Sequence, residues 1–120
     1  MSSSGPNVAE VMKLRDLVAY QNGAIVSRTL TSAEGGTVTA FAFDVDQGLS
    51  EHTAPYDALV IVLEGETHLQ ISGKSYSLSG GDMIIMPANK SHALRAIMRF
   101  KMLLIMIRTS EAHVDGRSPT

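Results

Sequence analysis

The sequence predicts an all-β protein, built as a barrel or a jelly roll. Short apolar or alternating segments recur along the chain, glycine-containing turns separate them, and only residues 8–18 carry a helical pattern. Many short strands with little helix are typical of antiparallel barrels, because each strand buries one face against a shared core. At 120 residues the chain is long enough for one such domain, which buries about two-thirds of its unfolded surface.

The composition excludes several classes of function. Twelve acidic and ten basic residues give a net charge of -2, which argues against a protein that binds the nucleic-acid backbone. There is no cysteine, so disulfides and thiolate zinc sites are excluded, and a reducing compartment is favoured. The longest apolar runs, 58–63 and 102–107, are too short to span a membrane. We therefore expect a cytoplasmic protein without a nucleic-acid or membrane partner.

Three segments are expected in chain order: a flexible N-terminus over 1–10, one barrel domain over 11–108 and a polar tail over 109–120. Asn7 and Glu10 have the spacing of a capping box, and apolar residues follow at roughly helical spacing. This pattern predicts a short N-terminal helix within residues 8–18.

The first strands are predicted on either side of the Glu34-Gly35-Gly36 turn. Residues 24–31, after the Asn22-Gly23 turn, are rich in β-branched side chains. Residues 37–46 alternate, which places Phe41 and Phe43 on one face together with threonines. We expect this aromatic face to point into the barrel.

Residues 58–63 are apolar at every position, which predicts a strand buried on both faces. One face belongs to the barrel interior, so the other must meet a second layer or another subunit. Leu103, Ile105 and Ile107 form a similar second apolar face on the last predicted strand, 97–108. A lone barrel of this size cannot easily cover both faces, so we expect a homodimer. The remaining strands are predicted at 67–72, 75–78, 83–86 and 93–96.

Two histidines stand near strand ends, where barrel mouths and binding sites occur. His52 precedes a strand interrupted by Pro55, and His92 follows the loop 87–91. Imidazole is a common metal ligand, and two of them on adjacent strands can share one ion. Spacing alone favours the alternative of two unrelated loop histidines that make ordinary hydrogen bonds.

The two histidine segments resemble the paired motifs of the cupin superfamily, which are RmlC-like jelly-roll β-barrels that often hold a metal at the mouth. In the first motif His52 and Gly65 match, while Ala54 and Ala58 stand where a second histidine and a glutamate are usual. Gly48 lies closer to His52 than the motif asks.

In the second motif Gly81, Pro87 and His92 match the pattern. Asn89 replaces a glycine, which is a mild change because asparagine also tolerates a left-handed backbone. Ala96 replaces an asparagine. The resemblance covers residues 37–108 and implies a cupin with a degenerate metal motif.

The resemblance implies a site for one divalent transition metal (zinc, iron, manganese, nickel or copper) held by His52 and His92. Asp57 is one residue from the glutamate position, so it faces the site only if a bulge near Pro55 shifts the strand. We expect a small-molecule pocket beside the metal, and its predicted ligand-contacting residues are Phe43, Tyr56, Asp57, His92, Phe100 and Met102.

Two functions stay open at this point, and no catalytic residue is assigned. One is a binding protein in which the histidines bind a small molecule, with or without a metal. The other is a metal-dependent enzyme, such as a dioxygenase, isomerase or decarboxylase, with open metal positions for its substrate. Metal-dependent turnover that disappears in His52→Ala and His92→Ala would separate them.

Overall fold

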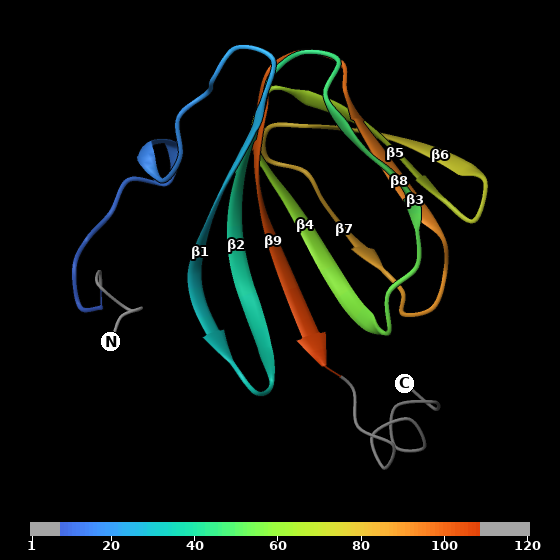
Figure 1. Ribbon diagram of the computed structural model, residues 1–120, viewed down its shortest axis with the longest axis horizontal. Coiled ribbons are helices and arrows are strands. Elements are labelled where there is room, and N and C mark those ends of the chain that lie inside the picture. The colour runs from blue at the N-terminus through green and yellow to red at the C-terminus, as the bar shows by residue number, and fades with distance from the viewer. Residues whose placement is uncertain (1–7, 109–120) are drawn as a thin grey trace.

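The structure is a computed structural model that describes residues 8–108. Within them, nine strands form two antiparallel sheets that face each other (Figure 1). In chain order they are β1 (Ile25–Ala33), β2 (Gly36–Phe43), β3 (Gly48–His52), β4 (Tyr56–Glu64), β5 (Glu66–Ile71), β6 (Lys74–Ser79), β7 (Met83–Met86), β8 (His92–Ala96) and β9 (Phe100–Arg108). The predicted all-β jelly roll is confirmed. The tail 109–120 and most of the predicted flexible N-terminus 1–10 lie outside the described residues.

One sheet has five strands in the order β1-β2-β9-β4-β7, and the other has four in the order β3-β8-β5-β6 (Figure 1). The core lies between them because alternate side chains of each strand point inward. On β4 the inward residues are Ala58, Val60 and Val62, and on β5 they include Leu69 and Ile71. Thr67, Leu69 and Ile71 alternate with polar residues in the sequence, and the strand predicted over 67–72 has them on its inner face.

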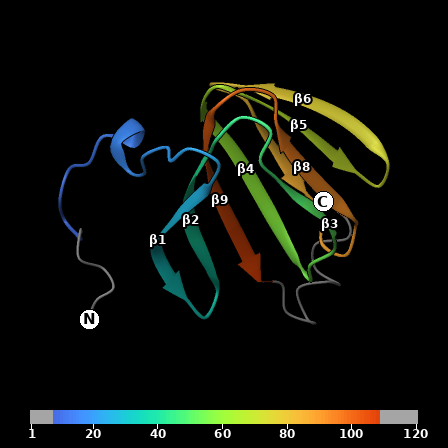
Figure 2. The same cartoon turned by 45° about the horizontal axis from the view of Figure 1, so that its top comes forward.

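The aromatic face of β2 points into the barrel, as predicted. Phe43 is fully buried there and stacks on Phe100 of β9, with ring centroids 4.6 Å apart. The opposite face of β2 is buried as well, because Leu17 and Val18 of the N-terminal segment pack with Ala40 and Ala42. Figure 2 shows this segment running alongside the five-stranded sheet before β1 begins.

The short helix predicted within residues 8–18 is present as a single 3-10 turn, η1 (Leu14–Asp16), and not as a longer α-helix. The capping residue proposed for it, Asn7, lies outside the described residues. Val8 and Val11 are exposed, so no apolar surface supports a helix at that end. None of the helices in residues 8–108 is long and apolar enough to cross a membrane.

Polar contacts fasten the N-terminal segment to the five-stranded sheet. Lys101 is buried on β9, and its ammonium group donates to the carbonyl of Arg15 and lies 5.0 Å from the Tyr20 ring centroid. The Tyr20 hydroxyl donates to Glu64 at 2.7 Å. Burial raises the pKa of Tyr20, and the hydrogen bond to Glu64 and its negative charge raise it further.

We expect Tyr20 to make the fold sensitive to alkali. Unfolded tyrosine ionises near pH 10, whereas the raised pKa keeps Tyr20 neutral in the folded state. Its contribution is therefore complete below about pH 10 and is lost as the pH rises towards the folded pKa. In Tyr20→Phe we expect a loss of about 1–2 kcal/mol in unfolding free energy at pH 7, from the missing hydrogen bond.

Urea unfolding of both proteins between pH 7 and pH 11 measures this effect. The stability difference between wild type and Tyr20→Phe should shrink above pH 10, since every other ionisable group is common to both proteins and cancels. A difference that stays constant to pH 11 would contradict the role given to the Tyr20 hydroxyl.

Candidate functional site

The structure brings His52 and His92 together. They are register partners on the adjacent strands β3 and β8, at an irregularity of the pairing between Leu49 and His52. Their rings meet edge to face with centroids 4.4 Å apart, and the two Nε2 atoms are 3.2 Å apart. A pair that is 40 residues apart in sequence is thus formed by strand pairing alone.

The other ring nitrogens fix how these imidazoles are protonated. His52 Nδ1 lies 2.8 Å from the carbonyl oxygen of Ser50, and His92 Nδ1 lies 3.2 Å from that of Lys90. A carbonyl oxygen only accepts, so each Nδ1 is assigned a proton, and whenever such a ring is neutral its lone pair is on Nε2. The two Nε2 atoms face each other at a distance at which they can share a proton in a hydrogen bond or can both bind one cation.

The surroundings of His92 favour its neutral form. Burial lowers the pKa of His92, and the neighbouring charge of His52 lowers it further. His92 therefore favours the neutral form, in which its Nε2 lone pair is available as a donor to a metal.

The spacing of the two Nε2 atoms fits two ligands of a tetrahedral divalent metal. Two imidazoles bound at about 2.0–2.1 Å to a tetrahedral ion have nitrogens about 3.3 Å apart, close to the distance seen here. Backbone carbonyls on the other nitrogen are the usual means of orienting such ligands. Within residues 8–108 no group of three or more His, Cys, Asp or Glu side chains could hold a metal. The two histidines therefore fit as one half of a coordination sphere.

The loop before His92 is held by backbone contacts to the β3–β4 connection. Asn89 adopts a left-handed backbone with φ of 66°, which confirms the expectation for this replacement of a glycine. Its N–H donates to the carbonyl of Ala54 at 2.8 Å. Ser91 donates to Glu51 at 3.0 Å, which links the loop to β3 beside His52.

Asp57 is used in this loop rather than in the histidine site. Its carboxylate accepts the N–H of Ala88 at 2.9 Å, and it forms no metal-binding group with the two histidines. The pairing irregularity expected near Pro55 lies earlier, between Leu49 and His52. Asp57 therefore keeps the parity of the outward face of β4, and the expectation that it completes the metal site is corrected.

The two imidazoles lie at an apolar cavity between the sheets, with a volume of about 70 Å³. Every other side chain on its wall is apolar. The wall consists of Leu49, His52, Ala54, Ala58, Val60, Leu69, Met86, His92, Ala93, Leu94, Met102, Leu104 and Met106. The arrangement is a small hydrocarbon-lined chamber with two nitrogen donors as its polar groups.

The predicted pocket residues divide into two groups. Met102 and His92 line the cavity. Phe43 and Phe100 do not, because they stack on each other as fully buried core residues, which corrects their expected place on the wall. Tyr56 also lies off the wall, with the Arg108 guanidinium 5.6 Å from its ring centroid.

Apart from the two histidines, sequence reasoning missed the wall residues contributed by β3, β5, β7 and β8. The alternation of apolar and polar residues around Leu69 indicates that its side chain points inward, and this signal could have assigned it to the cavity wall. Nothing in the local sequence of Leu49 or Met86 indicates that they meet Met102 across the barrel.

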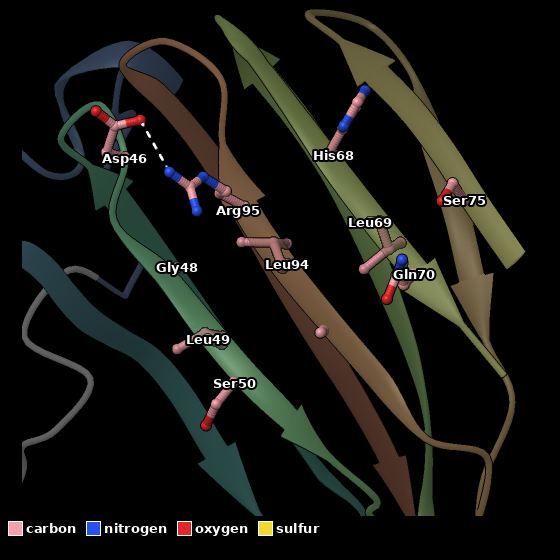
Figure 3. Close-up of a pocket in the computed structure, with 11 residues that line it drawn as sticks. Asp46, Gly48, Leu49, Ser50, His68, Leu69, Gln70, Ser75, Leu94 and Arg95 are labelled. Atoms are coloured by element: carbon pink, nitrogen blue, oxygen red, sulfur yellow. Dashed lines mark hydrogen bonds and ion pairs between the residues drawn. The ribbon is translucent and has the colours of Figure 1, made fainter. Parts of the chain in front are cut away.

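A larger depression of about 440 Å³ lies on the outer face of the four-stranded sheet (Figure 3). His68, Gln70 and Ser75 line it, and at one end Arg95 pairs with Asp46 at 3.3 Å (Figure 3). Both members of that pair are mostly exposed to solvent. The smaller interior cavity is the better candidate, because it encloses its ligand volume and holds the paired donors.

Comparison with known proteins agrees with this architecture. The profile of the family described as cupin domain matches residues 41–107. A conserved protein of unknown function from Streptococcus pyogenes is 32% identical with a TM-score of 0.83, over 91% of this chain and 97% of that one. A cupin superfamily protein from Desulfitobacterium hafniense is 26% identical with a TM-score of 0.79, over 83% and 92%.

A cupin 2 conserved barrel domain protein from Leptotrichia buccalis is 38% identical with a TM-score of 0.78. The match covers 81% of this chain but 47% of that one, so this chain spans about half the length of that relative. No curated protein matches the chain.

Proposed function

The chain belongs to the cupin domain family, and from this premise we propose that it is a small-molecule-binding cupin whose His52 and His92 hold one divalent metal ion. The observation that carries the proposal is the pair of facing Nε2 atoms, 3.2 Å apart, on the wall of an apolar cavity. Neutral imidazoles with their Nδ1 atoms bound to carbonyls are oriented to share a cation.

The chain's own residues bind and orient a ligand here. The carbonyls of Ser50 and Lys90 fix the direction of the two rings. The apolar wall excludes water from the ligand and strengthens any polar contact made at the imidazoles. A bound metal would supply Lewis acidity toward an oxygen atom of that ligand.

A metal-dependent enzyme is the second candidate. It is favoured by the small number of protein ligands, which leaves metal positions open for a substrate. The cavity wall, however, offers no proton donor or acceptor besides the two imidazoles. We therefore favour binding over catalysis, and dioxygenase, isomerase and decarboxylase activities are the assays to run on metal-loaded protein.

The metal proposal is tested by titrating zinc into metal-free protein and measuring bound metal by plasma mass spectrometry. We expect about one equivalent in the wild type. In His52→Ala and His92→Ala we expect affinity to fall about 100-fold or more, since the loss of an outer partner alone costs about 10–100-fold. Folding of each variant is checked by circular dichroism.

His68→Ala is the matched control, because His68 is an exposed histidine on the outer face of the same sheet. It should bind zinc as the wild type does. A wild type that takes up no zinc after reconstitution, or variants that bind it equally well, would overturn the proposal.

We also propose that the protein is a homodimer joined through the outer face of its five-stranded sheet. Eight apolar side chains adjoin one another there across four strands. We call them the outer apolar face: Val38, Leu59, Ile61, Met83, Ile85, Leu103, Ile105 and Ile107. Met83, Ile85 and Ile107 are 50%, 55% and 45% exposed. A second copy suits this face, since an uncharged apolar patch is complementary to itself under twofold symmetry.

Light scattering at micromolar concentration should give twice the chain mass. Ile105→Glu places a charge at the centre of the outer apolar face, between Val38 and Leu59, and should shift the protein to monomer. Ile97→Glu is the control, because Ile97 is 42% exposed in the turn before β9 and lies off this face. A monomeric wild type would contradict the proposal.

A further inference from the structure

The composition of the cavity wall restricts what can enter it. Of its residues only His52 and His92 carry polar side-chain atoms. A polar group buried without a partner costs free energy, so a ligand can place polar atoms only at the imidazoles and must be hydrocarbon elsewhere. The wall therefore selects a molecule with one polar end and one apolar end.

The volume sets the length of the apolar end. A dry cavity of about 150 Å³ lined by apolar side chains holds benzene. The cavity here, at about 70 Å³, has room for about half as much hydrocarbon, a chain of about three carbon atoms. Met86, Met102 and Met106 line it, and their unbranched, flexible side chains can yield space for about one carbon more.

The charge at the histidine pair sets the chemistry of the polar end. Two neutral imidazoles leave the double positive charge of a metal ion uncompensated. No aspartate or glutamate of residues 8–108 joins them in a metal-binding group, and Ala58 occupies cavity wall beside them. An anionic oxygen donor brought by the ligand would supply the missing negative charge.

Resting on the proposed metal site, we propose that the ligand class is a short-chain aliphatic monocarboxylate of about four to five carbons, counting the carboxyl carbon. Its carboxylate completes the coordination begun by His52 and His92, and its alkyl chain fills the cavity between the sheets. The protein supplies the neutral donors, and the ligand supplies the charge.

The test is calorimetric titration of the zinc-loaded full chain with acetate, propionate, butyrate, valerate and octanoate. Affinity should rise about fourfold for each added methylene up to the length that fills the cavity, and then fall. Butan-1-ol, which has a similar chain without the charge, should bind at least tenfold more weakly than butyrate.

A variant of the cavity wall tests whether the alkyl chain of the ligand occupies the cavity. Met106→Ala enlarges the cavity and should move the preferred acid to a longer chain. Ile107→Ala is the matched control, since the next residue of β9 points to the outer apolar face and should leave the preference unchanged. If Met106→Ala fails to fold, Leu104→Ala removes a neighbouring part of the wall and makes the same prediction.

The outcomes separate this inference from the metal proposal. Zinc binding with no dependence on chain length, or with butan-1-ol equal to butyrate, overturns the carboxylate inference and leaves the metal site standing. Absence of zinc binding in the first titration overturns both.

Discussion

Replacing Phe100 by alanine is expected to lower the unfolding free energy by about 3–5 kcal/mol. Phe100 is fully buried at the start of β9, and its ring stacks on that of Phe43 with an interplanar angle of 10°. The change removes a large apolar surface and leaves a cavity that two opposed sheets cannot close. Domains are stable by only about 5–15 kcal/mol, so the variant should show a large fall in its urea midpoint.

Met98→Ala is the control for this change, since Met98 is 50% exposed in the turn just before Phe100 and should alter stability by no more than about 0.5 kcal/mol. If Phe100→Ala does not fold, Phe100→Leu keeps most of the volume and still removes the stacking. A double-mutant cycle with Phe43→Ala should give a coupling of about 0.5–1.5 kcal/mol. A loss under 1 kcal/mol for Phe100→Ala would contradict its place at the centre of the core.

The strands could be predicted because their signals are local. On residues 66–71 the alternation of apolar and polar side chains reflects the pleat directly, and β5 has the predicted inner face. The predicted strand 83–86 coincides with β7. The order of the strands within each sheet could not be predicted from such local signals. It depends on which strands pair with each other, and β4 pairs with β9, some forty residues away.

The N-terminal helix is only one turn long for an energetic reason. A helix of about eleven residues is marginal in water and needs an apolar surface to pack on. Here the sheet accepts only Leu17 and Val18 at the end of the segment, over Ala40 and Ala42. The chain therefore follows the sheet in an extended form. These contacts join residues that are 22 to 25 positions apart in the sequence, so a periodicity within one segment cannot predict them.

The two histidines of the candidate site could be predicted from the sequence, whereas the residues that line the cavity could not. His52 and His92 were expected to share a site, and strand pairing places their Nε2 atoms 3.2 Å apart. Phe43 and Phe100 were expected on the pocket wall. The alternation along a strand shows which side chains point inward, but it does not show whether they fill the core or line a cavity. That distinction depends on side-chain volumes across the barrel, where two stacked rings fill one end and smaller or flexible residues leave space at the other.

Gly65→Ala is expected to cost about 2–5 kcal/mol, from two separate causes. Gly65 has φ of 86°, a left-handed conformation that costs an L-residue about 1–2 kcal/mol. An added Cβ would also lie 2.5 Å from the Cβ of Phe100 and overlap the carbonyl oxygen of Arg99. Overpacking of this kind typically costs a further 1–3 kcal/mol or so, and here it would push on the first residue of β9.

Gly73→Ala separates the two causes. Gly73 has a nearly equal φ of 82°, and an added Cβ there would meet nothing within 4 Å. Gly73→Ala should therefore lose only the unfolding free energy due to the backbone conformation, about 1–2 kcal/mol. Urea unfolding measures the loss in both variants, and the difference between them is the loss caused by steric overlap at Gly65. If the two glycines cost the same, the close approach of the β4–β5 turn to Phe100 does not constrain the core, and Gly65 is required for its backbone angle alone.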